Sequence, residues 1–241
     1  MILKLTLEYD GTCFRGWARQ PGERTVEGAL RDALDAVFRS WEGLAVAGRT
    51  DTGVHATGQV TSLAAHGGPP PERVAEALNA ELPDDVAVLE AEKAPAEFHA
   101  RFSARSRVYR YRVLARRTPA PLEFRRALRW PRPIDLESLV AAAALVHGEH
   151  EFRAFTPSET QHRVFRRNVL SSGWTLEGDR LDFTITADSF LRHMVRTLVG
   201  TMLEAGSDAP SRIRSLLDGG TRADAGLTAP PWGLYLERVD Y

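Results

Sequence analysis

Apolar and polar side chains alternate at the start of the chain. From Leu3 to Tyr9 every second residue is apolar, and a period of two is typical of a strand with one buried face. Further along, apolar residues from Val26 to Phe38 recur at intervals of three and four, and Thr25 precedes them. This spacing predicts a helix that Thr25 caps and that lays an apolar stripe on a sheet.

The same two periods recur along the rest of the chain. Further strands are predicted at 44–47, 59–64, 86–91, 108–114, 168–174, 181–187 and 234–239. Further helices are predicted from Pro71, after an Asp135 cap, from an Asp188 cap to Leu203, and after Pro210. The predicted inward positions are Val74, Ala75, Leu78 and Leu82 in the first of these helices, and Leu136, Leu139, Val140 and Ala143 in the second.

The order of these elements predicts the fold class. Strand, helix, strand, strand, helix, strand is the split unit of ferredoxin-like domains, and the second half of the chain repeats it. We therefore expect an α+β protein with two ferredoxin-like halves, an N-terminal domain at 1–103 and a C-terminal domain at 104–241. The halves would join at about Phe102 to Arg107, with insertions at Thr118 to Pro133 and at Thr156 to Gln161.

Composition narrows the class of protein. Of the 241 residues 43% are hydrophobic, which suffices for a packed core. The chain opens directly into an alternating pattern, and nowhere are there eighteen consecutive apolar residues, so we expect a protein that is neither secreted nor membrane-spanning. The one cysteine, Cys13, excludes an internal disulfide and a cysteine-based zinc site, which fits a cytoplasmic protein.

Positive charge is concentrated in one part of the chain. The formal net charge of −1 argues against a protein that binds nucleic acid over its whole surface. From Arg101 to Arg117, however, there are seven arginines and no acid, with aromatic residues between them. Further arginines that extend this run along the chain are Arg125, Arg126, Arg129, Arg132, Arg163, Arg166 and Arg167. The pattern predicts an electropositive track along a phosphate backbone, although a preference for arginine over lysine is also a feature of some genomes.

The stretch from Ala47 to Val60 reads A-G-R-T-D-T-G-V-H-A-T-G-Q-V. Its three glycines allow sharp turns or a close approach to a ligand. Arg49 and Asp51 are two residues apart, so on an extended backbone both side chains point the same way, and a neighbouring guanidinium keeps a carboxylate ionised. We expect a loop mounted on a strand pair that carries chemistry. The alternative is an aspartate that only caps its own turn.

This stretch resembles the signature of TruA-type tRNA pseudouridine synthases, whose nucleophile is the aspartate of R-T-D, here Asp51. Further motifs that carry the resemblance are Y-D-G-T at Tyr9 to Thr12 with Gly16-Trp17, F-H-A-R-F-S-A at Phe98 to Ala104, Tyr109-Arg110-Tyr111, F-L-R-H-M-V-R at Phe190 to Arg196, and G-L-Y-L at Gly233 to Leu236. The sequence departs from the family pattern at Ala18 and between Phe155 and Arg167. These departures concern local RNA contacts and leave the chemistry intact.

The resemblance implies an activity and a set of site residues. Uridine would become pseudouridine at positions 38, 39 and 40 of the anticodon stem-loop, without a metal or cofactor, in a homodimer whose sheets run together across a central cleft. Asp51 would act as nucleophile or catalytic base, Tyr109 would stack on the target uracil, and Arg196 would pair with Asp51. Arg49 would enter the RNA where the base leaves, and Leu234 would wall the uracil pocket. Arg107 and Arg110 belong to the arginine run, which predicts that they contact the RNA backbone, and we expect His193 to contact the same phosphates. Tyr111 shares a strand face with Tyr109, so either of them is a candidate for the stacking ring.

Two other functions remain open at this stage. A non-catalytic RNA-binding module on a ferredoxin-like fold would be expected to carry the K/R-G-F/Y-G/A-F-V-x-F/Y strand motif, which neither half has. A metal-dependent hydrolase would use Asp51 and His55. A metal site would be built from His147 and His150 with His55 and His66, but there is no H-E-x-x-H pattern. We therefore interpret His55 as a hydrogen-bond donor that shapes its loop.

Overall fold

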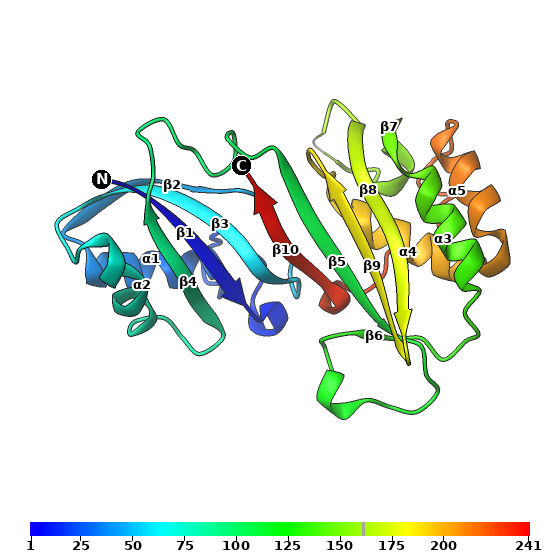
Figure 1. Ribbon diagram of the computed structural model, residues 1–241, viewed down its shortest axis with the longest axis horizontal. Helices are drawn as coiled ribbons and strands as arrows, with labels where there is room; N and C mark the ends of the chain where they lie inside the picture. The colour runs from blue at the N-terminus through cyan, green and yellow to red at the C-terminus, as the bar shows by residue number, and fades with distance from the viewer. Residues whose placement is uncertain (161) are drawn as a thin grey trace. The chain divides into compact units, whose positions relative to one another are not determined.

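The chain folds into two compact units. The computed structural model describes residues 1–160 and 162–241 and has the predicted α+β character. One unit is formed by Met1–Arg105 with Tyr235–Tyr241, and the other by Ser106–Leu234 (Figure 1). The first break lies close to the predicted boundary after residue 103, whereas the last strand groups with the first unit and not with the second.

The first unit is a sheet with two helices on one face. Its elements are β1 (Ile2–Tyr9), α1 (Val26–Val37), β2 (Ser40–Val46), β3 (His55–His66), α2 (Pro71–Asn79), β4 (Val86–Lys93) and β10 (Leu234–Asp240), of which β10 begins one residue before the unit boundary. The strands lie in the order β4, β1, β3, β10, and β2 also pairs with β3. The pairs are antiparallel except for β3 with β10, which is parallel, so the sheet is mixed.

The first strand and first helix confirm the periodicity. Leu3, Leu5 and Leu7 of β1 are wholly buried. Thr25 is the N-cap of α1, and its hydroxyl accepts the Gly28 N–H at 3.2 Å. Such a cap satisfies one of the N–H groups that the first helical turn leaves without a partner, and its loss costs about 1 kcal/mol.

Three elements of this unit have other limits than predicted. Strand β2 begins at Ser40, four residues before Leu44, and ends at Val46. Strand β3 begins at His55, four residues before Gln59, because it is a central strand with partners on both sides and is buried along most of its length. A strand buried on both faces loses the alternation that marks its ends. Helix α2 ends at Asn79, so the predicted inward position Leu82 lies beyond the helix and is half-buried.

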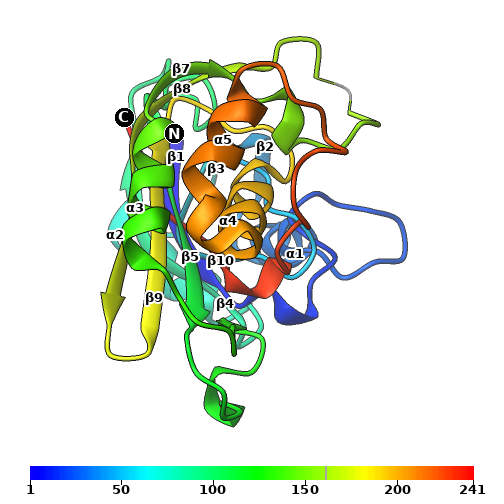
Figure 2. The same ribbon diagram turned by 90° about the vertical axis from the view of Figure 1, so that its right-hand side faces the viewer.

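The second unit is a sheet covered on one face by three helices, which Figure 2 shows together. Its elements are β5 (Ser106–Leu114), β6 (Leu128–Arg129), α3 (Leu136–Leu145), β7 (Gly148–Glu151), β8 (Arg166–Glu177), β9 (Arg180–Ala187), α4 (Met194–Ala205) and α5 (Ala209–Leu217). The strand order is β5, β9, β8, β7, with β6 parallel to β5. The predicted insertion from Thr156 ends on Gln161, which lies outside the described residues.

The start of α4 and one inward position of α3 were predicted wrongly. Helix α4 begins at Met194, not after Asp188. The Asp188 carboxylate accepts the N–H groups of Ser189 and Asn168, so it caps a turn instead of a helix. Asp135 does cap α3, but Val140 is exposed, and the helix buries Leu139, Ala142 and Ala143 instead.

In the part of the chain that the structure describes, no helix combines the length and the apolar character needed to cross a membrane.

Candidate active site

The Asp51 loop occupies residues 47–54, between the paired strands β2 and β3. Its position on a strand pair is as predicted. Asp51 is half-buried and Arg49 is exposed. The Val54 N–H donates to the Asp51 carbonyl oxygen at 3.1 Å, which closes a turn directly after the carboxylate. The loop is therefore a short, internally bonded turn that presents one acidic side chain.

The segment after β1 lies against the back of this loop. The Trp17 N–H donates to the Thr50 carbonyl at 3.0 Å, and the Gly53 N–H donates to the Phe14 carbonyl at 3.4 Å. Gly16 lies between these two bonds with φ +91°, and a Cβ at this position would be 2.9 Å from the Thr50 carbonyl oxygen. Only glycine allows both this left-handed conformation and this approach. The backbone of residues 14–17 thus fixes the backbone on either side of Asp51.

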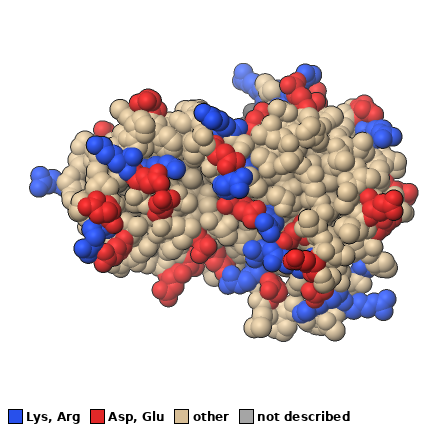
Figure 3. All heavy atoms as spheres, in the orientation of Figure 1, with Lys and Arg blue, Asp and Glu red and all other residues tan. Residues whose placement is uncertain are grey.

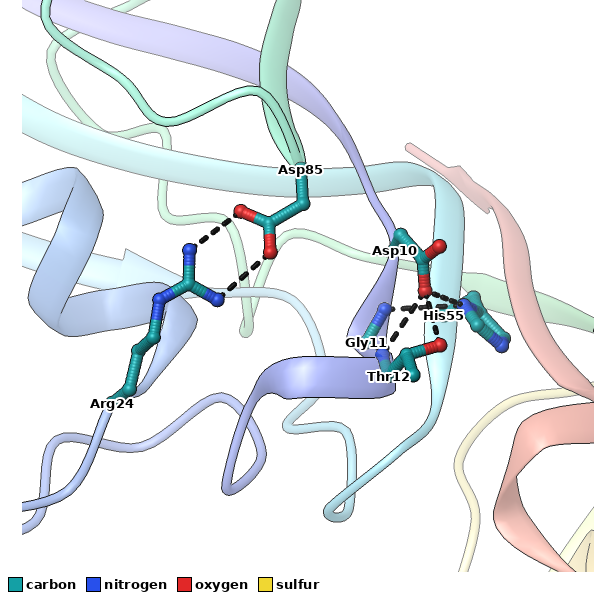
Figure 4. Close-up of polar contacts among 6 residues, drawn as sticks. All are labelled: Asp10, Gly11, Thr12, Arg24, His55 and Asp85. Atoms are coloured by element: carbon teal, nitrogen blue, oxygen red, sulfur yellow. Dashed lines mark hydrogen bonds and ion pairs between the residues drawn. The ribbon is translucent and has the colours of Figure 1, made fainter. Parts of the chain in front are cut away.

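A second support is the cluster of Asp10, Gly11, Thr12 and His55 in Figure 4. A Cβ on Gly11 would overlap the Val54 carbonyl group, so the 3-10 helix Gly11–Cys13 touches the end of the loop directly. The Gly11 N–H donates to His55 Nδ1 at 3.1 Å, and Asp10 Oδ1 accepts the N–H and the hydroxyl of Thr12. These bonds connect the end of β1 to the first residue of β3.

The His55 ring is a buried structural group. It is 1% exposed and stacks on Tyr235 with 4.6 Å between ring centroids. Asp10 Oδ1 lies 3.1 Å from Nδ1, a contact that is an ion pair only for a doubly protonated ring. The same Nδ1 accepts the Gly11 N–H, so this nitrogen lies between a backbone donor and a carboxylate. We predicted His55 to be a hydrogen-bond donor that shapes its loop; in this contact Nδ1 accepts, so the predicted donor role stays a prediction.

A buried polar chain holds the start of the loop. The Tyr9 hydroxyl lies 2.8 Å from Thr50 Oγ1, and the Gln59 amide donates to Tyr9 at 3.2 Å and to the Gly48 carbonyl at 2.7 Å. Burial raises the pKa of the Tyr9 phenol to about 12, against the smaller lowering effect of its hydrogen bonds. The phenol therefore stays neutral and can serve this network as donor and acceptor across the physiological range.

The outer end of the supporting segment is tied down by an ion pair. The Arg24 guanidinium donates to both oxygens of Asp85, at 2.7 and 2.8 Å (Figure 4), and lies 4.0 Å from the centroid of the Phe14 ring. The hydrogen bonds to Asp85 raise the pKa of this arginine. The pair is largely exposed, so its contribution to the free energy of unfolding is small. Its bidentate geometry nevertheless fixes where the segment from 10 to 24 runs.

In the second unit, the two tyrosines of β5 have different surroundings. Tyr111 is wholly buried, its hydroxyl donates to the Pro230 carbonyl at 2.8 Å, and its ring touches Gly233. Burial raises the pKa of its phenol well above the usual range, against the opposite effect of the Arg196 charge. Tyr109 is 8% exposed and meets Phe190 edge to face at 4.9 Å. Tyr111 is thus a core residue, which leaves Tyr109 as the candidate for stacking.

Arg196 is half-buried in the first turn of α4. Its Nε donates to the Ala229 carbonyl at 2.8 Å, and its own carbonyl accepts the Ala229 N–H at 3.0 Å. Within the second unit the guanidinium is therefore bonded to a backbone oxygen, which orients the side chain. The pairing with Asp51 would join the two units and stays a prediction.

The residues predicted to contact the RNA backbone differ in their burial and in their bonds to other protein groups. Arg107 is 9% exposed and donates to the Asp188 carbonyl at 2.7 Å. Arg110 forms an ion pair of 3.2 Å with Asp182. His193 precedes α4 with φ 63° and is half-buried. By contrast, Arg101, Arg105 and Arg117 are exposed. These three are the most accessible of the seven arginines from Arg101 to Arg117.

Leu234 is 6% exposed at the start of β10, as expected for a residue that walls a pocket or simply packs in a core. A separate cavity of about 460 Å³ lies in the first unit between the end of α1 and β2. Arg31, Asp35, Arg39 and Trp41 are among its lining residues, and none of the predicted site residues is. The Asp51 loop of the first unit and Tyr109 of the second are therefore each described within its own unit.

The histidines do not assemble as metal ligands. In residues 1–160 and 162–241, no group of three or more histidine, cysteine, aspartate or glutamate side chains is placed to hold a metal ion. His150 lies on β7, and its Nε2 is 2.9 Å from the His147 carbonyl. The arrangement gives no support to the alternative of a metal-dependent hydrolase.

Sequence reasoning missed the residues that position the loop. Gly11, Gly16 and Gln59 were parts of motifs or strands without an assigned role, and Phe190 was not connected with Tyr109. The one signal in the sequence was the left-handed preference of glycine near Trp17, which indicates a turn but not what the turn touches.

The chain is similar to known proteins over its whole length. A family model described as tRNA pseudouridine synthase matches residues 6–103 and 142–241. The tRNA pseudouridine synthase A of Bacillus subtilis (strain 168) is 40% identical over 245 residues, covering 100% of this chain and 99% of the relative. The protein of that name from Moorella thermoacetica is 40% identical over 243 residues, covering 99% of both. Among solved structures, a crystal structure of a Cbf5-Nop10-Gar1 complex matches with a TM-score of 0.40 and 13% identity, covering 97% of this chain and 48% of that one.

Proposed function

Because the chain belongs to the tRNA pseudouridine synthase family, we propose that it isomerises uridine to pseudouridine at positions 38, 39 and 40 of the tRNA anticodon stem-loop. The observation that carries the proposal is the Asp51 loop. Its R-T-D sequence matches the family signature, and the Gly16 and Trp17 backbone fixes the residues around the carboxylate. A carboxylate that is held in place and half-exposed is the group that the reaction needs.

The reaction rearranges bonds without a change of composition. The bond between ribose C1′ and uracil N1 breaks, the base turns, and C1′ joins C5. The proton on C5 leaves, and N1 takes up a proton. No electron is gained or lost, so the protein has to supply a carboxylate, a surface for the base, and a way to draw the nucleotide out of its stack.

We assign these tasks to residues of both units. Asp51 acts as the nucleophile, and the exposed Arg49 next to it enters the space that the target base leaves. Tyr109 supports the uracil ring, with Phe190 behind it as a fixed edge. Arg196, oriented by the Ala229 carbonyl, holds the catalytic carboxylate ionised, and Leu234 packs against the base. The RNA backbone would be contacted by Arg107, Arg110 and His193.

The assignment of Tyr109 predicts a difference between two variants. Tyr109→Phe is expected to keep most of the affinity for tRNA, because the ring face remains, and to lose only what the hydroxyl does. Tyr109→Ala should lose in addition about 1 to 3 kcal/mol of stacking. Equilibrium binding of an unmodified tRNA transcript measures both, and Tyr111→Phe, which alters a buried hydroxyl only, is the matched control. Equal affinities of the Tyr109→Phe and Tyr109→Ala proteins would show that the ring face is not the contact.

The exposed arginines predict how binding depends on salt. Arg105→Ala or Arg117→Ala should lower the slope of log K against log salt concentration by about one for each phosphate that the variant no longer binds. Arg73→Ala removes the same charge from α2, where the guanidinium pairs with Glu76, and should leave the slope unchanged. If every single replacement between Arg101 and Arg117 keeps the parent slope, the electropositive track has no part in binding.

We also propose the finer architecture and setting that the resemblance implies. Each unit would be a ferredoxin-like half, and the strand order β4, β1, β3, β2 of the first unit supports this. The protein would act as a homodimer in the cytoplasm. Sedimentation equilibrium of the purified protein tests the dimer.

The proposed function is tested by release of tritium from C5 of uridine. Purified protein should release label from an unmodified tRNA transcript, because joining C5 to the ribose expels the C5 proton. A transcript with cytidine at positions 38, 39 and 40 should release none. Release that is equal from both transcripts would place the activity elsewhere in the tRNA, and no release from either would contradict the proposed function.

A further inference from the structure

A loop between β5 and α3 projects from the second unit. In Figure 1 it extends below β5 and β6, and Figure 2 shows the same projection after a quarter turn. Residues 115–134, called the projecting loop below, include the predicted insertion from Thr118 to Pro133. Its tip is the 3-10 helix Pro121–Glu123 with the residues directly after it.

The projecting loop has a defined structure. At the tip, the Glu123 N–H donates to the Ala120 carbonyl at 3.0 Å, and the Arg126 N–H donates to the Glu123 carbonyl at 2.9 Å. At the base, β6 pairs with the end of β5, and the Arg129 guanidinium donates to the Arg117 carbonyl at 2.6 Å. Arg125 has φ 56°, a left-handed conformation that is unfavourable for any residue except glycine. Such conformations persist where the surrounding structure holds them, and they are enriched at ligand-binding sites.

Two large apolar side chains stand exposed at this tip. Leu122 is 92% exposed and Phe124, two residues later, is 74% exposed. Single exposed apolar residues are common and need no explanation. A pair on a hydrogen-bonded turn that extends away from its unit is different, because the turn keeps both side chains from folding back onto the chain. The tip is therefore shaped to offer an aromatic ring to a partner.

The charge around the tip indicates what kind of partner fits. The projecting loop contains six arginines, Arg116, Arg117, Arg125, Arg126, Arg129 and Arg132, and one acid, Glu123. The Arg125 guanidinium lies 5.7 Å from the centroid of the Phe124 ring. In Figure 3, basic side chains gather in the lower right of the view, beside a few acidic ones. Two copies of so basic a loop repel each other, whereas a polyanion with exposed rings complements it.

We propose that the projecting loop is a second RNA contact, in which Phe124 stacks on an unpaired base of the tRNA and the arginines around it bind the adjacent phosphates. The inference rests on the proposed function, because that function brings a tRNA to the protein. Unpaired RNA bases stack on aromatic side chains and on guanidinium planes, and the tip offers both. Leu122 widens the apolar surface beside the ring.

This contact lies away from the residue that would hold the target base. Tyr109 and Leu114 are five residues apart on β5, which corresponds to about 17 Å, and the projecting loop begins beyond Leu114. The loop therefore contributes to the affinity for tRNA and not to the chemical step. Variants of its tip should raise KM and leave kcat close to the parent value.

The test uses substitutions at position 124 that distinguish stacking by the aromatic ring from simple burial of apolar surface. Phe124→Ala should raise the Kd for full-length unmodified tRNA about 5- to 150-fold, the range expected for the loss of one stacked base. Phe124→Trp keeps a ring face and should bind like the parent protein. Phe124→Leu keeps apolar area without a ring and should bind like the alanine variant. Leu89→Ala, which truncates a 53% exposed leucine on β4, is the control for surface truncation and should not change Kd.

The contrary results are equally specific. An unchanged Kd for Phe124→Ala overturns the inference, and so does parent-like binding by Phe124→Leu, which would assign the contact to apolar area alone. A changed molar mass in sedimentation equilibrium, with unaltered tRNA affinity, would show instead that the tip joins two copies of the chain. Failure of the proposed function is recognised separately, because the parent protein would then release no label from C5, whereas all of these binding constants remain measurable.

Discussion

Asp51→Asn is expected to reduce turnover of uridine in tRNA below detection while the protein stays folded. The substitution keeps the shape and volume of the side chain but removes its charge and its nucleophilicity. Binding of tRNA should persist, since it depends on the exposed arginines and on the stacking residues. Loss of one negative charge near phosphates is expected to leave the affinity equal or somewhat higher.

The alternative role of Asp51 predicts the opposite result. If the aspartate only capped its turn, asparagine would be a nearly equivalent cap and activity would stay near normal. Asp32→Asn, which removes the same charge from an exposed position on α1, is the matched control and should keep full activity. A folded Asp51→Asn protein that turns over at close to the parent rate would remove Asp51 from the mechanism.

Gly16→Ala is expected to lower kcat about 100-fold or more. A Cβ at this position would be 2.9 Å from the Thr50 carbonyl oxygen and 3.2 Å from the Thr52 nitrogen, and both neighbours are backbone atoms. The loop around Asp51 must therefore shift, and a displacement of about 1 Å of a reacting group costs on the order of 100-fold in rate. Because alanine is strained at the left-handed φ of +91°, the substitution should also lower the free energy of unfolding by about 1 to 2 kcal/mol.

Substitution of a second glycine, Gly22, distinguishes the effect of backbone strain from the effect of displacing the Asp51 loop. Gly22 also has a left-handed φ, +73°, but a Cβ there would meet nothing within 4 Å. Gly22→Ala should lower the free energy of unfolding by about 1 to 2 kcal/mol and leave kcat unchanged. Denaturant unfolding and single-turnover rates measure the two effects. Parent-like rates in a folded Gly16→Ala protein would show that the loop is not positioned by this contact.

Periodicity was sufficient for elements with one buried face. Strand β9 buries Leu181, Phe183 and Ile185, so its alternating pattern predicted it correctly, although Asp182 between the first two is also buried. The start of α4 was wrong because aspartate suits helix caps and turns alike, and only the pairing of Asp188 with the Ser189 and Asn168 N–H groups distinguishes them. Strand β3 was predicted too short because its first residues include His55 and Gly58, which are buried but do not extend the apolar pattern.

The candidate site was predictable in its residues but not in its supports. The Asp51 loop was predicted from its glycine spacing and from its resemblance to a family signature. Both signals lie in residues that are neighbours in the sequence. The contacts of Gly11 with Val54 and of Gly16 with Thr50 join positions more than thirty residues apart, which no local pattern encodes. The choice between Tyr109 and Tyr111 was likewise open, because both have the same strand periodicity. The bond from Tyr111 to Pro230 shows that Tyr111 is engaged in the core, and the stacking role of Tyr109 stays a proposal.

The central claim is that this chain makes pseudouridine in the anticodon stem-loop, and the most direct test is in the cell. Pseudouridines are mapped in total tRNA from a strain that lacks the protein, and again after return of either the parent or the Asp51→Asn chain. The account predicts that modification at positions 38, 39 and 40 disappears, that the parent chain restores it, and that the Asp51→Asn chain does not. Unchanged modification at these positions in the strain without the protein would contradict it.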